Sequence, residues 1–431
     1  MRILVVGGGA REHALVHVLA RGGHDVVCAP GNPGIPGSLG VGVRPEDVEA
    51  DLVVVGPEQP LVDGLADRLR AKGRLVFGPG ADGARLEGSK AWMKDVLAGA
   101  GVPTANHASF DAADPDSQAK AAAFLRTLPG LYVVKTDGLA AGKGVLVTES
   151  LAEATEDVRA KLSGAAFGDA GRRVVIEEGL TGPELSVLAV CDGARPAILA
   201  PAQDHKRIGD GDTGPNTGGM GAYSPVPFAA GLEDVVREPI ERTLAELARR
   251  GIDYRGVLYA GMMLTPDGPK MLEYNVRFGD PEAQVVLPRL ADDLGTLLAA
   301  AASGDLTKAG PHALVPRNIP DAAVTVVLAA PGYPTGPRLG GLVGGIDEAG
   351  SLPGVTVFHA GTAAAPDGSG RLVTAGGRVL SVTAVAPTLA QARTRAYDAC
   401  GWITWEGLYN RTDIALSAMT HCATNQQEAS R

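Results

Sequence analysis

The sequence predicts an α/β protein of several domains that begins with a doubly wound parallel sheet and ends with a smaller, β-rich domain. Three observations predict this class. Residues 1–80 alternate apolar runs with helical segments, which is typical of parallel strands buried on both faces. Residues 322–412 combine many glycines with β-forming runs. The length of 431 residues suits about three domains of the usual size.

The N-terminal sheet is expected to have four strands, several of which end in a Gly or Pro turn. The apolar runs lie at residues 2–6, 24–29, 52–55 and 75–77. Ligands of open parallel sheets bind at the carboxyl ends of the strands, where these turns fall. This end of the sheet is therefore the first place to expect a site.

The first of these turns, Gly7-Gly8-Gly9, is expected to open a helix. It resembles a dinucleotide fingerprint, but Glu12 stands where the third glycine belongs. The turn instead predicts a phosphate- or sugar-sized site at the helix N-terminus, with Arg11 and Glu12 directed into it. The alternative is a tight turn that carries an Arg–Glu pair on the surface.

The middle and C-terminal segments predict further helices and strands. Ser89 is expected to cap a helix from Lys90 that ends at Gly99 and Gly101. Strands are expected at 132–136, 145–148, 174–178, 185–191 and 197–200, and helices at 232–250 and 282–303. A hairpin is expected at 257–276, and after the prolines at 311, 316 and 320, strands at 324–329, 355–359 and 379–385 and a helix near 388–400.

Composition and charge exclude several classes of function. The net charge of −10 disfavours general binding to nucleic acids or anionic membranes, and the aromatic content of 4% is low for a surface that stacks on bases. No apolar run approaches the ~20 residues of a membrane span. The four cysteines are scattered, which predicts reduced thiols and a cytoplasmic location.

The segment Gly138-Leu-Ala-Ala-Gly-Lys-Gly144 resembles a phosphate-binding loop. It is one residue short between its glycines, and Gly144 replaces the hydroxyl residue that would bind Mg²⁺. A strand is expected to follow it, so we expect a lid within a hairpin, whose backbone N–H groups contact phosphates. The metal ion must then be bound elsewhere.

Glu273 and Asn275 form the candidate metal site. They lie two residues apart on an expected strand, so both side chains share one face. A carboxylate and an amide oxygen side by side suit Mg²⁺ that bridges nucleotide phosphates, although exposed strands often carry such pairs. Arg277 continues this face and is expected to bind a phosphoryl group or an anionic substrate.

Buried lysines and a strand that ends in acids suggest a nucleotide site. Lys135 lies on an apolar strand and needs an anion, for which phosphate is the natural candidate. Lys90 begins a helix, where a cation is unfavourable unless an anion offsets it. Edge groups at the end of strand 174–178 are expected to contact an adenine, and a nearby carboxylate to accept ribose hydroxyls.

Residues 203–224 form a long, polar, glycine-rich stretch, which we expect to be a substrate loop without regular structure that orders on binding. A disordered linker is the alternative.

Taken together, several motifs resemble the phosphoribosylamine–glycine ligase family of ATP-grasp enzymes, from residue 1 to about 413. The resemblance is carried by GGAREHA (8–14), GPEQPLV (56–62), LEGSK (86–90), DGLAAGKGV (137–145), QDHKR (203–207), NTGGMGAYSP (216–225) and RFGDPE (277–282). It implies an N-terminal domain at 1–89, an ATP-grasp domain at 90–305 with a lid at about 104–180, and a C-terminal domain at 320–431.

The resemblance also implies an activity and its residues. The expected reaction joins glycine to 5-phosphoribosylamine with ATP, through a glycyl phosphate, and Mg²⁺ or Mn²⁺ is bound by Glu273 and Asn275. The expected nucleotide contacts are Lys90, Lys135, Gly142, Lys143, Gly144, Glu177, Glu178, Leu180 and Glu184. The expected substrate contacts are Gly9, Arg11, Glu12, Glu58, Asp212, Asn216, Gly218, Gly219 and Arg277. The expected catalytic residues are Arg277, Lys135 and Lys206.

Two other functions stay open at this point. One is a nucleotide-binding protein without ligase activity, which would release no phosphate when glycine and phosphoribosylamine are added. The other is an ATP-grasp enzyme that activates bicarbonate in place of glycine. Strand 259–263 offers no acid for a further metal ligand. Only small-molecule partners and a monomer are expected.

Overall fold

The computed structural model describes residues 1–138, 144–165 and 172–419. Its first part is a parallel sheet in the order β2-β1-β3-β4, as the sequence predicts. The strands are β1 (Arg2–Gly7), β2 (Asp25–Pro30), β3 (Leu52–Val55) and β4 (Val76–Phe77), and the helices are α1 (Ala10–Arg21), α2 (Glu58–Val62), α3 (Leu65–Ala71) and α4 (Ala81–Gly88). Both faces of β1 are buried, because its alternate side chains belong to two different hydrophobic cores, Leu4 and Val6 to one and Ile3 and Val5 to the other.

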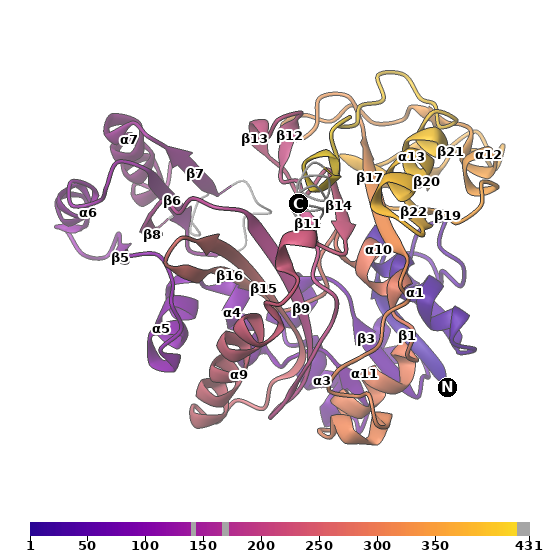
Figure 1. Ribbon diagram of the computed structural model, residues 1–431, viewed down its shortest axis with the longest axis horizontal. Coiled ribbons are helices and arrows are strands. Elements are labelled where there is room, and N and C mark those ends of the chain that lie inside the picture. The colour runs from indigo at the N-terminus through magenta and orange to yellow at the C-terminus, as the bar shows by residue number, and fades with distance from the viewer. Residues whose placement is uncertain (139–143, 166–171, 420–431) are drawn as a thin grey trace, which may run out of the picture.

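A separate lobe covers residues 107–178 and stands apart from the rest of the molecule (Figure 1). It is an antiparallel sheet in the order β5-β8-β6-β7 with two helices and a core of its own. Its strands are β5 (His107–Asp111), β6 (Tyr132–Thr136), β7 (Val145–Thr148) and β8 (Arg173–Glu178), and its helices are α6 (Ser117–Leu125) and α7 (Leu151–Leu162).

The central sheet has the order β10-β9-β15-β16 and is antiparallel. It consists of β9 (Glu184–Asp192), β10 (Pro196–Ile198), β15 (Arg255–Thr265) and β16 (Gly268–Asn275), with helices α5 (Lys90–Ala100), α9 (Glu233–Arg249), α10 (Ala283–Val286) and α11 (Leu294–Ala302) nearby. The predicted hairpin is confirmed as β15–β16. Ser89 caps α5 by accepting from the Trp92 N–H, and Gly101 ends it in a left-handed conformation with φ of 64°.

The C-terminal part contains a five-stranded and a three-stranded sheet. The larger has the order β11-β14-β17-β22-β19, and the smaller has the order β18-β21-β20. The strands are β11 (Gln203–Asp204), β14 (Gly221–Ser224), β17 (Ala322–Ala329), β18 (Leu342–Val343), β19 (Val355–His359), β20 (Thr362–Ala364), β21 (Leu372–Thr374) and β22 (Arg378–Ala386), with helices α12 (Ile346–Gly350) and α13 (Leu389–Cys400).

The prediction that residues 203–224 lack regular structure is wrong. This segment forms β11, the hairpin of β12 (Arg207–Gly209) and β13 (Thr213–Asn216), and the fully buried β14. Strand β14 pairs with β17, with Tyr223 opposite Val324. The partner strand lies far along the chain, so the pattern of residues 203–224 by itself gives no sign of it.

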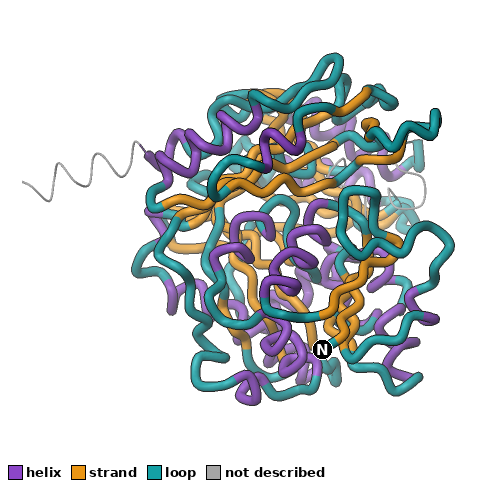
Figure 2. Tube along the Cα trace, turned by 90° about the vertical axis from the view of Figure 1, so that its right-hand side faces the viewer, coloured by secondary structure: helices purple, strands orange, loops and turns teal. Residues whose placement is uncertain are grey.

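These parts pack into one molecule in which strands run through the interior and helices and loops cover them (Figure 2). Helix α1 of the first part packs against β19 of the last part, and a single buried core extends from the N-terminal sheet to α13. Within the three described ranges, the helices are too short or too polar to cross a bilayer.

Candidate active site

A cavity of about 440 Å³ lies where the N-terminal, central and C-terminal parts meet. Many of the residues singled out in the sequence line it: Arg11, Glu58, Lys90, Gly144, Lys206, Asn216, Gly218, Glu273, Asn275 and Arg277. Sequence reasoning missed further polar residues of its wall: Glu87, Asp204, Tyr259, Asp280, Glu282, Tyr333 and Arg378. Asp280 and Glu282 belong to the RFGDPE motif, which was the available signal for them.

Other expected site residues lie elsewhere. Among the described residues, the lining does not include Gly9, Glu12, Lys135, Glu177, Glu178, Leu180, Glu184, Asp212 or Gly219. Gly142 and Lys143 lie outside the described residues.

Glu12 occupies the N-terminus of α1, where the sequence predicted room for an anion. The N–H groups of Gly8 and Gly9 donate to Glu12 Oε2 at 3.2 and 2.6 Å. A Cβ atom at Gly56 would stand 2.3 Å from Glu12 Oε1, so only a glycine leaves space for this carboxylate. Arg11 and Glu12 are 7% and 2% exposed, which also excludes a surface pair. Glu12 therefore caps the helix, while Arg11 extends to the cavity.

Arg277 is held in the cavity wall by acids from two other elements. Its Nε donates to Glu58 Oε2 at 3.1 Å, and its Nη2 donates to Glu87 Oε1 at 2.9 Å. Burial raises the pKa of Glu87. Burial also acts to raise the pKa of Glu58, but the guanidinium groups of Arg277 and Arg11 outweigh it and lower that pKa overall. A fixed guanidinium suits a phosphoryl or carboxylate group.

Glu273 and Asn275 lie on β16 and both reach the cavity, as their spacing predicts. Gly261 lies opposite Glu273 on β15, so no side chain from that position competes for the space. In the described ranges, no group of three or more His, Cys, Asp or Glu side chains forms a metal site by itself. The carboxylate and amide oxygens fit Mg²⁺, which usually takes one or two carboxylates and completes its shell with phosphates and waters.

Lys135 is buried against a protein anion. Its Nζ lies 2.9 Å from Glu177 Oε1, and the Nζ of Lys94 lies 3.0 Å from Glu177 Oε2. Glu177 is 2% exposed, and burial is the main reason that the pKa of Lys94 falls to about 8. The expectation that a buried Lys135 needs an anion is confirmed, but this anion is Glu177, a protein partner that the sequence did not predict.

The end of β8 offers fewer free edge groups than expected. The Glu178 N–H donates to Asn106 O at 2.9 Å, and the Gly179 N–H donates to Leu131 O at 2.8 Å. These two groups are therefore already used within the lobe.

Asp137 lies at the N-terminus of the helix that Lys90 begins. The carboxylate of Asp137 accepts from the Ala91 N–H at 3.0 Å, and so supplies the anion that a helix N-terminus prefers. The Nζ of Lys90 donates to Gly138 O at 3.0 Å. Burial lowers the pKa of Lys90, and the Glu273 carboxylate opposes this shift.

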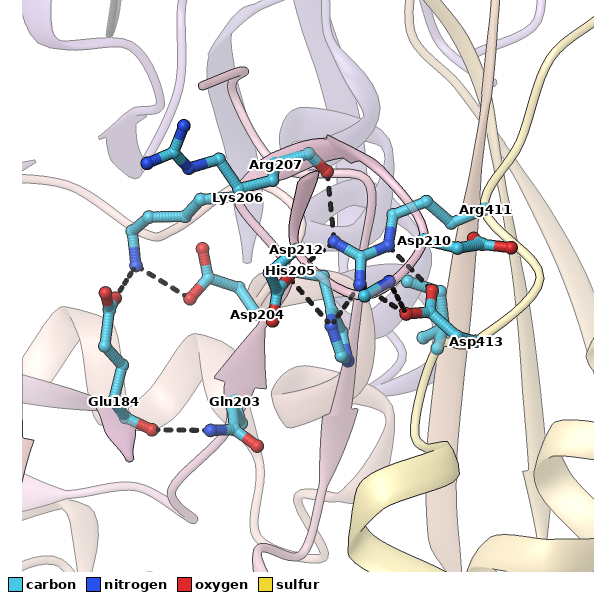
Figure 3. Close-up of polar contacts among 12 residues, drawn as sticks. Glu184, Gln203, Asp204, His205, Lys206, Arg207, Asp210, Asp212, Arg411 and Asp413 are labelled. Carbon is cyan, nitrogen blue, oxygen red and sulfur yellow. Dashed lines mark hydrogen bonds and ion pairs between the residues drawn. The ribbon is translucent and has the colours of Figure 1, made fainter. Parts of the chain in front are cut away.

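A second group of charges surrounds Lys206. Its Nζ donates to Glu184 Oε2 at 2.6 Å and to Asp204 Oδ1 at 2.9 Å (Figure 3). Burial acts to lower the pKa of Lys206, but these carboxylates raise it well above its usual value, so the ammonium stays charged.

Glu282 lies beside this group in the same wall. It is 2% exposed, and the Tyr259 hydroxyl donates to its Oε1 at 2.5 Å. Burial and the neighbouring Asp204 raise the pKa of Glu282 to about 7. A carboxyl group of this kind exchanges protons near neutral pH.

Three family descriptions match the chain in order. The phosphoribosylglycinamide synthetase N domain matches residues 1–87, the ATP-grasp (A) domain residues 88–283, and the C domain residues 323–417. Proteins named phosphoribosylamine--glycine ligase from Brucella melitensis and Streptomyces coelicolor are 46% and 48% identical, over 99% and 97% of this chain and 100% and 99% of their own.

Solved structures agree with these matches. A phosphoribosylamine--glycine ligase from Thermotoga maritima is 35% identical with a TM-score of 0.83, and covers 96% of this chain and 100% of its own. A biotin carboxylase domain from Hydrogenobacter thermophilus, in complex with MgADP, has a TM-score of 0.71 at 16% identity over 95% of this chain and 91% of its own, which supports the fold alone. The chain therefore belongs to the phosphoribosylglycinamide synthetase family, an ATP-grasp family of ligases.

Proposed function

We propose that this protein joins glycine to 5-phosphoribosylamine with ATP, and forms glycinamide ribonucleotide, ADP and phosphate for purine biosynthesis. One observation carries the proposal. Residues from all three matched segments line a single cavity, in which Glu273, Asn275 and Arg277 stand together. A cytoplasmic monomer that acts only on small molecules, with domains at 1–89, 90–305 and 320–431, is part of the proposal.

The residue roles that the family resemblance implies complete the proposal. ATP lies between the lobe and the central sheet, with Lys90, Lys135 and the Gly142–Gly144 loop at its phosphates and Glu177–Leu180 and Glu184 toward the nucleoside. Phosphoribosylamine lies nearer the first and last parts of the chain, beside Arg11, Glu58, Asn216 and Gly218. The presence of all four residues in the cavity lining supports this half of the assignment.

Mg²⁺ bound by Glu273 and Asn275 supplies positive charge that stabilises the transferring phosphoryl group. The double substitution Glu273→Ala with Asn275→Ala is expected to lower Mg²⁺-dependent turnover by about 100-fold or more, because both protein ligands are lost. Turnover measured against Mg²⁺ concentration checks this. Turnover equal to that of the parent protein would exclude the metal assignment.

Amide formation needs an activated glycine, because a carboxylate is a poor electrophile. A glycine oxygen attacks the γ-phosphorus of ATP, the bond to the β-phosphate oxygen breaks, and ADP leaves with that electron pair. Arg277 is held by Glu58 and Glu87, and it neutralises the charge that develops on the phosphoryl oxygens. Lys206, which lines the same cavity, supplies further positive charge, and Lys135 is assigned the same role from the family resemblance.

In the second step the amine nitrogen attacks the glycyl carbonyl carbon. The carbon–oxygen bond to phosphate breaks and phosphate departs with its electron pair. The surplus proton on nitrogen passes to the carboxylate of Glu282, whose pKa of about 7 suits this transfer. The lid expected at about 104–180, which contains the lobe, closes over the cavity and keeps water from the acyl phosphate.

The test is ADP release from purified protein with ATP and Mg²⁺. Sustained ADP release over many turnovers is expected only when both glycine and phosphoribosylamine are present, with one phosphate released per ADP. Bicarbonate in place of glycine is expected to support no release. Equal ADP release without glycine, or release with bicarbonate, would overturn the proposal in favour of the corresponding alternative.

A further inference from the structure

The hairpin β12–β13 brings several residues to the cavity from its open end. Lys206 directly precedes β12, while Asn216, Thr217 and Gly218 lie at and after the end of β13, and all four line the cavity. Asp210, Gly211 and Asp212 form the far tip. A two-stranded hairpin is marginally stable by itself, so its position depends on what holds it.

Arg411 is the main support of this hairpin, and it comes from the last part of the chain (Figure 3). It is 1% exposed. Its Nη1 donates to Asp212 Oδ1 at the tip at 2.6 Å, and to the carbonyl of Arg207 at the start of β12 at 3.1 Å. Its Nε and Nη2 donate to Asp413 Oδ1 and Oδ2 at 2.8 and 2.7 Å, which fixes the plane of the guanidinium.

Neighbours of Arg411 continue the same attachment. Asp413 Oδ2 also accepts from the Gly211 N–H at 2.8 Å, and Asp210 Oδ1 accepts from the Thr412 N–H at 2.8 Å. Asp212 has a φ of 54°, a left-handed conformation that few non-glycine residues adopt. The carboxylate of Asp212, which was expected to contact substrate, is directed toward Arg411 instead.

We infer that Arg411 is a positioning residue, which holds the hairpin through Asp212 and the Arg207 carbonyl so that Lys206 and residues 216–218 face the substrates. The inference rests on the proposed function for its kinetic consequence. The side-chain partners of Arg411 are the Arg207 carbonyl, Asp212, Asp413 and His205, and none of them lines the cavity. Arg411 therefore acts through the hairpin and not on the reacting atoms.

The energetics favour a geometric role over a purely stabilising one. A buried ion pair gains little stability over apolar side chains of the same volume, because both charges lose their hydration. Several hydrogen bonds from one guanidinium, in contrast, fix the orientation of the groups that accept them, here the tip and the first strand of the hairpin. A shift of ~1 Å in groups that contact substrate lowers turnover by about 100-fold, so such fixing matters for catalysis.

The test compares two variants with a matched control. Arg411→Lys keeps the charge but cannot span Asp212 and Asp413 together. Asp212→Asn removes the charge at a mostly exposed side chain and keeps a residue that tolerates positive φ, so it folds even if the buried variant does not. The control is Arg395→Lys, whose guanidinium on α13 donates to Pro353 O and Val385 O of its own domain.

Kinetics provide the first readout. Both variants are expected to lower kcat/KM for phosphoribosylamine by about tenfold and to change the KM for ATP by less than about twofold, since ATP contacts lie mainly on the lobe and β16. The double variant is expected to be no slower than Arg411→Lys, because both changes remove the same contact. The inference would be overturned if Asp212→Asn had the same kinetic constants as the parent protein. It would also be overturned if only kcat fell, and fell in proportion to the fraction of protein that is unfolded.

Hydrogen exchange provides a readout that does not need the reaction. The Thr217 and Met220 amides donate to Lys206 O and His205 O, and both are expected to exchange faster in the two variants, with the lobe and Arg395→Lys unchanged. Unchanged exchange at these amides overturns the inference. The two proposals can also fail separately. If the parent protein shows no glycine-dependent ADP release, but these amides exchange faster in the variants, the proposed function is wrong and the role of Arg411 in holding the hairpin is still supported.

Discussion

Glu177 lies between two lysine ammonium groups in the interior, at 3.0 Å from Lys94 and 2.9 Å from Lys135. Burial acts to raise the pKa of Glu177, but the two lysines outweigh it and lower that pKa, so the carboxylate stays charged. The group thus carries two positive charges and one negative charge away from water. Removal of the negative charge would leave two buried cations without the carboxylate that pairs with both.

Glu177→Gln is therefore expected to lower the free energy of unfolding by about 3–5 kcal/mol. Urea denaturation followed by circular dichroism measures this. The control is Glu156→Gln on the surface of α7, which breaks an exposed pair with Arg159 and is expected to change stability by less than about 0.5 kcal/mol. Equal unfolding midpoints for the two variants would contradict the importance of the buried group.

A second prediction concerns Glu282 and the pH dependence of the reaction. Its surroundings are Asp204, which raises its pKa, and Lys206 and the Tyr259 hydroxyl, which lower it, with Arg277 close by. As a proton acceptor it must be ionised, so kcat/KM is expected to rise with pH through about 7.

Glu282→Gln is expected to lower kcat by about 100-fold and to remove the rise of kcat/KM near neutral pH, because an amide cannot accept the proton. Rate profiles from pH 6 to 9 with saturating ATP measure this. If the variant kept the same dependence of rate on pH as the parent protein, a group other than Glu282 would be responsible for it.

At the scale of elements, the N-terminus of α1 depends on a close fit between three segments. Gly7 ends β1, Gly56 follows β3, and the Glu12 carboxylate lies against both. Its two hydrogen bonds satisfy N–H groups at the start of the helix, and its Oε1 holds Arg11 Nε at 2.5 Å. The cap of one helix thereby sets the direction of an arginine that lines the cavity.

Gly56→Ala is expected to lower stability by about 1–3 kcal/mol, because the added methyl group would stand 2.3 Å from Glu12 Oε1. It is also expected to raise the KM for phosphoribosylamine, since Arg11 loses its partner. Denaturation and steady-state kinetics measure the two effects. Gly336→Ala, where a Cβ meets open space, serves as the control and is expected to change neither.

At the scale of the whole molecule, two buried histidines join the first and last parts of the chain. The His359 N–H on β19 donates to His13 Nδ1 on α1 at 2.9 Å. Burial lowers the pKa of His13 to about 3, with further lowering by His359 and His17, and burial lowers the pKa of His359 to about 4. Both are therefore neutral in the folded protein at pH 7.

Stability is expected to fall as the pH drops below about 6.5, because the unfolded chain then takes up protons that the folded protein cannot. At pH 5 the loss is about 2 kcal/mol for each histidine. The double variant His13→Gln with His359→Gln is expected to lose less stability than the parent between pH 7 and pH 5. Identical losses in urea titrations at both pH values would show that other groups govern acid sensitivity.

The elements were largely predictable because their signals are local. Apolar runs alternate with helices in the first 80 residues, Ser89 and Gly101 bracket α5, and Pro266-Asp267-Gly268 turns a hairpin. Period two on β16 also placed Glu273 and Asn275 together in the cavity. Each of these depends on neighbours within a few residues, which the sequence displays directly.

Residues that pair across long distances were not predictable in this way. The anion of Lys135 and the partner of Asp212 each depend on a side chain brought close by folding. Segment 203–224 is polar and rich in glycine, yet β14 is buried because β17 supplies its hydrogen bonds. A polar segment is therefore expected to be exposed only when no strand from elsewhere in the chain forms hydrogen bonds with its backbone.

The sequence by itself determined the family, the class of fold, and the strand that presents Glu273 and Asn275, because these rest on short motifs and local periodicity. Only the tertiary structure decided which charges neutralise one another, and that an arginine near the end of the chain holds a hairpin at the cavity. Electrostatic pairing and burial depend on distance in space, and distance in space is set by the packing of all three parts together.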